Sequence, residues 1–158
     1  MSDRFFCFWE PELVTCDVSG DCFLMQVFAL TGGIATGKST AGKMISRLMP
    51  TSAFFDCDES VQSLLQKREV LDEISEALGQ SVTKTDGSLD RAALRKLVFG
   101  NDILRGKLEI ILHPKVRKEC LEKLDFYSKT TPTTLFVADV PLLFESGFDF
   151  GQELNLVV

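Results

Sequence analysis

The sequence predicts an α/β protein in which a parallel sheet is flanked by helices, and three observations predict it. First, the short apolar run at residues 27–31 is bounded by glycine, as is typical of a buried parallel strand. Second, apolar residues then recur at i, i+3, i+4 and i+7, which is one face of a helix: Ala41, Met44, Ile45 and Leu48. Third, further strand-like runs occur at residues 52–56, 134–143, where the strand leads into a turn, and 154–158, and helical stretches precede the first two of these runs.

The stretch between the second and third predicted strands is helical. Helical spacing continues to about Leu78, and residues 79–88 ("GQSVTKTDGS") form a loop. Residues 89–100 are helical with Gly100 near the C-cap, and Asn101 caps a helix that is expected to break at His113-Pro114 and to resume from residue 115. A helical insertion over about 60–128 should therefore cover the carboxyl ends of the strands, where ligands bind in such sheets.

Residues 1–24 show no sustained period and none of the features of a signal peptide. They are either an upstream extension or a short packed arm that uses Phe5, Phe6, Phe8 and Trp9, and the sequence favours neither. The domain is expected to span residues 25–158 and to open on the strand that follows Met25.

The stretch "TGGIATGKST", residues 31–40, fits the phosphate-binding pattern G-x-x-x-x-G-K-[ST]. It lies between a predicted strand and a predicted helix, as the pattern requires, and this context predicts the P-loop nucleoside-triphosphate hydrolase fold. Lys38 would reach the terminal phosphates of a nucleotide, and the hydroxyl of Ser39 or Thr40 could hold Mg²⁺. The alternative is a glycine-rich turn with a surface lysine, which the flanking strand and helix disfavour.

Charge and composition exclude several classes of protein. The net charge is −6, but residues 27–158 hold 18 acidic and 16 basic side chains, so no broad basic field argues for nucleic-acid binding. No apolar run approaches the roughly 20 residues of a membrane span. The five cysteines form no C-x-x-C pair, which fits a reducing compartment and a cytoplasmic location.

Three acidic residues follow predicted strands. Asp56 and Asp58 end the second strand, where a carboxylate can act as the base in phosphoryl transfer, and an extended segment would place both on one face. A purely structural role, with Asp58 as the N-cap of the next helix, is equally consistent with the residues. Asp139 follows four apolar residues and is a candidate metal-site acid, or else a turn-forming residue before Pro141.

The basic candidates lie on the predicted helical insertion. His113 is the only histidine of the chain, and it either terminates a helix or donates a hydrogen bond to a ligand phosphate. The arginines at 91, 95 and 117 are either solvated surface residues or part of a nucleotide-substrate site.

Four separated stretches together resemble dephospho-coenzyme A kinases: "VFALTGGIATGKST", "FFDCDESVQSLL", "DGSLDRAALRKLVF" with "ILHPKVRKE", and "VADVPLLFESGFD". The resemblance covers about residues 25–158. It implies transfer of the γ-phosphate of ATP, with Mg²⁺, to the ribose 3′-hydroxyl of dephospho-coenzyme A, the last step of coenzyme A synthesis.

The resemblance also assigns residues to roles. It implies that Asp58 is the base, that Lys38 contacts the transferred phosphate, and that Ser39 and Asp139 hold the metal. It implies an acceptor site on Arg91, His113, Arg117, Pro141, Leu142 and Glu145. It implies an ATP site made of Gly32, Gly33, Ile34, Ala35, Thr36, Gly37, Lys38, Ser39 and Thr40.

The chain departs from the family pattern in two respects. Ala35 and Thr36 stand where the family usually has Gly and Ser, and Ala35 would be strained if its φ were positive. The arginine-bearing lid of the family would come after Val158, so the terminal strand is expected to leave an apolar edge. A nucleotide-binding fragment without catalysis and a different small-molecule P-loop kinase are the alternatives, and the oligomeric state is not predicted.

Overall fold

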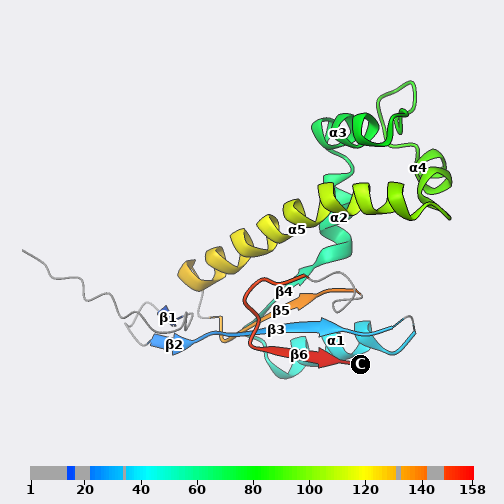
Figure 1. Ribbon diagram of the computed structural model, residues 1–158. Coiled ribbons are helices and arrows are strands. Elements are labelled where there is room, and N and C mark those ends of the chain that lie inside the picture. The colour runs from blue at the N-terminus through cyan, green and yellow to red at the C-terminus, as the bar shows by residue number, and fades with distance from the viewer. Residues whose placement is uncertain (1–13, 17–21, 34, 131–132, 142–147) are drawn as a thin grey trace, which may run out of the picture.

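A four-stranded parallel sheet forms the centre of the structure, in the order β4-β5-β3-β6 (Figure 1). The computed structural model describes residues 14–16, 22–33, 35–130, 133–141 and 148–158. The strands are β3 (Gln26–Thr31), β4 (Ser52–Asp56), β5 (Leu135–Asp139) and β6 (Leu154–Val157). All four strands end at the same edge, so the residues that follow β3, β4 and β5 meet there.

The period-2 alternation of the strands divides the core into two layers. On β3, Val27 and Ala29 face the larger cluster, which also contains Phe55 and Phe136. Leu30, the next residue along, faces a smaller cluster with Leu135 and Val137. Because both faces of the central strands are buried, these strands read as continuous apolar runs in the sequence.

The helices cover both faces of the sheet (Figure 1). The α1 helix lies along one face and contacts β3 and β4, whereas α5 runs across the other face and contacts β4. The two short helices α3 and α4 pack on the end of α5 that projects beyond the sheet. The helices are α1 (Lys38–Leu48), α2 (Cys57–Leu64), α3 (Arg68–Leu78), α4 (Arg91–Val98) and α5 (Asp102–Thr130).

The α5 helix is continuous through Pro114, so the break expected at His113-Pro114 is wrong. Asn101 does cap the helix, because its side chain accepts a hydrogen bond from the Leu104 amide at 3.1 Å. Proline removes the amide that would bond the carbonyl of Ile110, but the Ile110 side chain is 74% exposed, so water can reach that part of the backbone. Leu112 and Val116 are buried on either side of the proline, and this packing keeps the helix in one piece.

The apolar face predicted for α1 is only partly covered by the residues that the structure describes. Ala41 and Ile45 pack against the smaller core cluster, but Met44 is 56% and Leu48 is 79% exposed. The edge strand β6 is exposed along its length, with Leu154 and Val157 at 59% and 60%. Apolar surface therefore remains open on α1 and on β6.

An antiparallel hairpin precedes the sheet. It consists of β1 (Val14–Cys16) and β2 (Cys22–Leu24), and β1 contacts α5. Met25, which links β2 to β3, is 1% exposed and belongs to the larger core cluster. The four aromatic residues considered for a packed arm lie outside the described residues.

None of the helices in the described parts of the chain combines the length and the low charge that a bilayer span requires.

Candidate active site at the carboxyl edge of the sheet

The glycine-rich segment connects β3 to α1 at the carboxyl edge of the sheet. Gly37 is the N-cap of α1 with φ of 102°, a left-handed conformation that favours glycine. Gly32 lies so close to the backbone carbonyl of Val158 that a Cβ atom there would collide with it. The loop thus places the positive N-terminal end of an 11-residue helix next to a close-packed glycine backbone, which is an arrangement suited to binding phosphate.

Ala35 is strained in this loop. Its φ is 65°, and it is the only non-glycine residue with positive φ among the residues that the structure describes. The side chain makes this conformation about 1 kcal/mol less favourable than it is for glycine. Next to it, the Thr36 hydroxyl donates a hydrogen bond to the Gly33 carbonyl at 3.0 Å, which stiffens the loop.

Lys38, the first residue of α1, forms an ion pair with Asp139 at the end of β5. Both side chains are largely buried, at 18% and 21% exposed. Asp139 is also the register partner of Asp56 on β4. The lysine and two of the three candidate acids therefore lie together at one edge, and Lys38 is held beside a carboxylate that could also bind a cation.

The structure shows which of the two aspartates, Asp56 or Asp58, caps α2. Asp56 is the N-cap of α2, since its side chain accepts a hydrogen bond from the Glu59 amide at 3.0 Å. Asp58 lies inside the first turn of α2, so the structural alternative, in which Asp58 caps the helix, is wrong. Because the helix begins at Cys57, the two carboxylates do not share an extended face and instead line different cavities.

The electrostatic environment of Asp58 is suited to a base. Burial raises the pKa of the Asp58 carboxyl above its ordinary value, and repulsion from Asp56 raises it further. The charge of Lys38 acts in the opposite direction, and that of Asp139 adds to the rise. Asp58 therefore holds a proton more readily than an isolated aspartate, which improves its capacity as a proton acceptor.

A cavity of about 140 Å³ opens beside Asp58. It brings three of the predicted site residues together, namely Asp58 from α2, His113 from α5 and Pro141 after β5. The other lining residues were missed by the sequence analysis: Cys57, Val61, Val116, Val140 and Phe148. These are apolar side chains from four separate segments, and no local pattern marks them as neighbours.

The two arginines predicted to bind the acceptor, Arg91 and Arg117, are not among the described residues that line this cavity. Arg91 is the first residue of α4 and is exposed. The Arg117 guanidinium donates a hydrogen bond to the backbone carbonyl of Asp149. Ile34, Leu142 and Glu145 lie outside the described residues.

A second cavity, of about 410 Å³, lies on the opposite side of α2 and is lined by Asp56. In its wall Glu119 accepts hydrogen bonds from Ser60 at 2.6 Å and from Lys67 at 2.8 Å. Burial alone would raise the pKa of Glu119, but these two donors hold it below its ordinary value. This network joins α2 to α5 and fixes the helix that carries Asp58.

The carboxyl edge of the sheet offers oxygen donors, which are the ligands that Mg²⁺ prefers. Among the described residues, no group of three or more His, Cys, Asp or Glu side chains could hold a metal ion. Mg²⁺ needs fewer protein ligands, because it is usually bound by one or two carboxylates together with phosphates and water. The Asp139 carboxylate and the Ser39 hydroxyl supply oxygen donors of this kind.

Comparison with known proteins agrees with the geometry. The family model described as "CoaE: Dephospho-CoA kinase" matches residues 26–158. A dephospho-CoA kinase of Symbiobacterium thermophilum is 41% identical over 126 residues, which are 79% of this chain and 52% of that protein. One of Geobacillus kaustophilus is 39% identical over 131 residues, which are 82% of this chain and 63% of that protein.

Solved structures agree on the fold. The protein TT1252 from Thermus thermophilus matches with a TM-score of 0.69 and 28% identity, over 85% of this chain and 65% of that chain. A dephospho-CoA kinase from Campylobacter jejuni matches with a TM-score of 0.61 and 23% identity, over 84% of this chain and 66% of that chain. The predicted P-loop nucleoside-triphosphate hydrolase fold is confirmed. The chain spans about half to two thirds of the length of these relatives.

Proposed function

This chain belongs to the dephospho-CoA kinase family, and from that premise we propose that it transfers the γ-phosphate of ATP to the ribose 3′-hydroxyl of dephospho-coenzyme A. The product is coenzyme A, and ADP leaves. One observation carries the proposal. The phosphate loop with Lys38 and the cavity beside Asp58 open at the same edge of the sheet, so that a phosphate donor and a hydroxyl acceptor can meet there.

The phosphate loop and the start of α1 bind the phosphates of ATP. Backbone amides and the helix N-terminus favour the anion, and Lys38 adds the positive charge at the β- and γ-phosphates. Lys38 leaves its ion pair with Asp139 to do so, or shares it. The ion pair with Asp139 holds Lys38 at the start of α1, where the phosphates of a bound nucleotide would lie.

Ser39 and Asp139 are the residues that would hold Mg²⁺ here. The ion supplies positive charge that offsets the negative charge of the phosphates during transfer. The Asp139 carboxylate, which pairs with Lys38, would supply one oxygen ligand to the ion, and the Ser39 hydroxyl would supply another.

Asp58 accepts the proton of the ribose 3′-hydroxyl as that oxygen forms its bond to the γ-phosphorus and the bond between the γ-phosphorus and the bridging oxygen breaks. The apolar side chains around the cavity limit the access of water, which would otherwise compete with the acceptor. His113 lines the same cavity and can donate a hydrogen bond to the acceptor. The free, buried thiols of Cys57 and Cys120 are consistent with a reducing compartment, and we place the reaction in the cytoplasm.

The test is to incubate the purified chain with ATP, Mg²⁺ and dephospho-coenzyme A, and to follow coenzyme A and ADP by mass spectrometry. We expect the two products in equal amounts, and no coenzyme A when ATP is omitted. A set of other hydroxyl acceptors, among them adenosine and pantothenate, is assayed in parallel. Transfer to one of these but not to dephospho-coenzyme A would contradict the proposed acceptor.

A further inference from the structure

The short segment from Phe148 to Gln152 contributes Phe148 to the wall of the cavity beside Asp58, which is called the acceptor cavity below. Phe148 lines the cavity and is 8% exposed, and Phe150 is 2% exposed in the core. The two rings pack against each other with centroids 5.8 Å apart. Between them, Asp149 is exposed and its backbone faces α5.

This segment is a turn with its own hydrogen bonds. The Gly151 amide donates to the Asp149 carboxylate at 2.9 Å, and the Phe150 amide donates to the Gln152 side chain at 3.1 Å. Past the turn, the Glu153 amide donates to the Val27 carbonyl at 2.9 Å, which anchors the segment to the start of β3. The turn is thus fixed to the sheet on one side.

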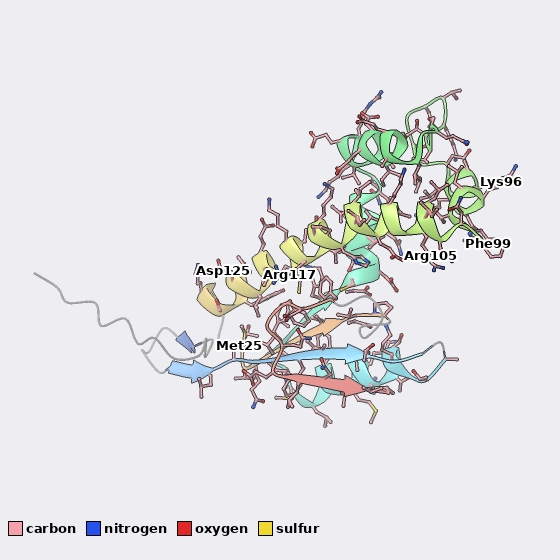
Figure 2. All side chains as sticks on the ribbon, viewed as in Figure 1. Met25, Lys96, Phe99, Arg105, Arg117 and Asp125 are labelled. Atoms are coloured by element: carbon pink, nitrogen blue, oxygen red, sulfur yellow. The ribbon has the colours of Figure 1, made fainter. Side chains whose placement is uncertain are left out.

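Arg117 fixes the other side. It lies one turn of α5 after His113, on the part of the helix that passes above the sheet (Figure 2). Its Nε–H donates to the backbone carbonyl of Asp149, the residue between the two buried phenylalanines. An arginine keeps its charge and its planar donor geometry, so this is a charge-assisted hydrogen bond to a carbonyl that no residue of the sheet holds in the described structure.

We propose that Arg117 is a positioning residue: it clamps the 148–151 turn to α5 so that Phe148 walls the acceptor cavity, rather than binding the acceptor with its own charge. This inference rests on the proposed function, because it takes the cavity beside Asp58 as the acceptor site. His113 and Val116, which line the cavity from α5, are thereby kept at a fixed spacing from Phe148. Loss of the clamp lets the Phe148 wall move away from α5 and widens the site.

A double-mutant cycle tests this role. Arg117→Met keeps an unbranched stem and removes the donor, and Phe148→Leu changes the wall itself. The dissociation constant of dephospho-coenzyme A is measured by calorimetry in the presence of a non-hydrolysable ATP analogue. Arg117→Met is expected to weaken binding about tenfold, the size of one charge-assisted hydrogen bond, and Phe148→Leu, which makes the cavity wall smaller, is expected to weaken it by about the same factor. Because both changes act on the same wall, the double variant should also lose about tenfold.

A direct contact between Arg117 and the acceptor predicts a different result, namely a loss of about 100-fold in the double variant, since independent effects multiply. That result, or unchanged binding by Arg117→Met, would overturn the proposal. The affinity for the ATP analogue should not change in any of the variants. Arg105→Met is the matched control, because Arg105 lies at the far end of the same helix (Figure 2) and pairs there with Asp102 and Glu109.

A second measurement does not depend on the acceptor. Native-state hydrogen exchange at the amides of Phe150 and Gly151 should be about tenfold faster in Arg117→Met than in the wild type, and exchange in β3 should be unchanged. Equal exchange at both amides would show that Arg117 does not hold the turn. Failure of the wild-type chain to bind dephospho-coenzyme A would instead count against the proposed function, and the exchange data would still decide whether the clamp exists.

Discussion

The two halves of the candidate site are built in different ways. The phosphate half comes from the continuous stretch of residues 31–40, which runs from the last residue of β3 into the first turn of α1, with Asp139 from the neighbouring strand. The acceptor half is assembled from α2, the middle of α5 and the segments that follow β5 and precede β6. The first half is set by local backbone geometry, whereas the second depends on how separate elements pack. Substitutions in the first should therefore weaken nucleotide binding, and transfer with it, whereas substitutions in the second should leave nucleotide binding unchanged and act on the acceptor and on transfer.

Asp58→Asn should have the largest effect, and it should fall entirely on transfer. Asparagine has nearly the same shape but cannot accept the hydroxyl proton, so the rate of phosphoryl transfer should drop by about 10² to 10⁴. Single-turnover quench experiments measure the rate, and calorimetry should find the ATP affinity unchanged. Asp56→Asn is the control, because asparagine still caps α2. Equal losses in the two variants would contradict a base role specific to Asp58.

Lys38→Ala should have the next largest effect, and it should fall on the phosphate half. The variant loses the cation that contacts the β- and γ-phosphates, and we expect the ATP affinity to fall about 100-fold. Calorimetric titration with the ATP analogue measures this change. Lys43→Ala, which removes an exposed lysine of the same helix, should bind normally. Tight binding by Lys38→Ala would rule out the phosphate assignment of the loop.

Ala35→Gly should have a smaller effect of opposite sign. Glycine adopts the φ of 65° without strain, so we expect the free energy of unfolding to rise by about 1 kcal/mol and the melting temperature by about 2–4 °C. The matched control is Ala41→Gly inside α1, where glycine should lower stability by about the same amount. Thermal unfolding followed by circular dichroism distinguishes the two. A destabilised Ala35→Gly variant would show that the loop does not strain residue 35.

The smallest expected effect is on the pH dependence of the melting temperature, through Asp58 in the acceptor half. Because the pKa of Asp58 is raised in the folded state, its ionised form is favoured less in the folded chain than in the unfolded one. Asp58→Asn should therefore melt slightly higher than the wild type at pH 7. The difference should shrink as the pH falls through the raised folded pKa, and vanish below the unfolded value of about 3.9. An Asp58→Asn variant that melts lower than the wild type at pH 7, with the deficit disappearing toward low pH, would mean that the pKa is lowered instead.

The phosphate half could be predicted from the sequence because its geometry is local. A glycine pattern between a strand and a helix determines where the loop lies, and the apolar runs of β3 and β5 locate the sheet. Asp139 could be placed at the same edge because parallel strands end together. The residues of this half are therefore either consecutive in the sequence or lie at the ends of neighbouring parallel strands.

The acceptor half could be predicted only in part, because long-range packing decides it. Helix propensity predicted a break at Pro114, but burial of Leu112 and Val116 overrides the lost hydrogen bond. The α2 helix begins at Cys57, two residues before the start at Glu59 that would have made Asp58 the N-cap, and Asp56 therefore caps it instead. Sequence propensities do not locate a helix end this finely. Phe148 belongs to the cavity only because the 148–151 turn folds back toward α5.

Cys57 lies between Asp56 and Asp58, and its position determines how its thiol reacts with alkylating reagents. Its thiol and that of Cys120 are buried in the larger core cluster, on α2 and α5. Burial raises the pKa of both thiols, to about 12 for Cys120, so almost no reactive thiolate exists at neutral pH. Alkylation of the Cys120 thiol, which is 0% exposed, then requires local opening around α5, whereas the Cys57 thiol lines the cavity beside Asp58. The two thiols therefore report different events: a bound acceptor should slow the modification of Cys57 by filling the cavity, and that of Cys120 only where it also slows local opening.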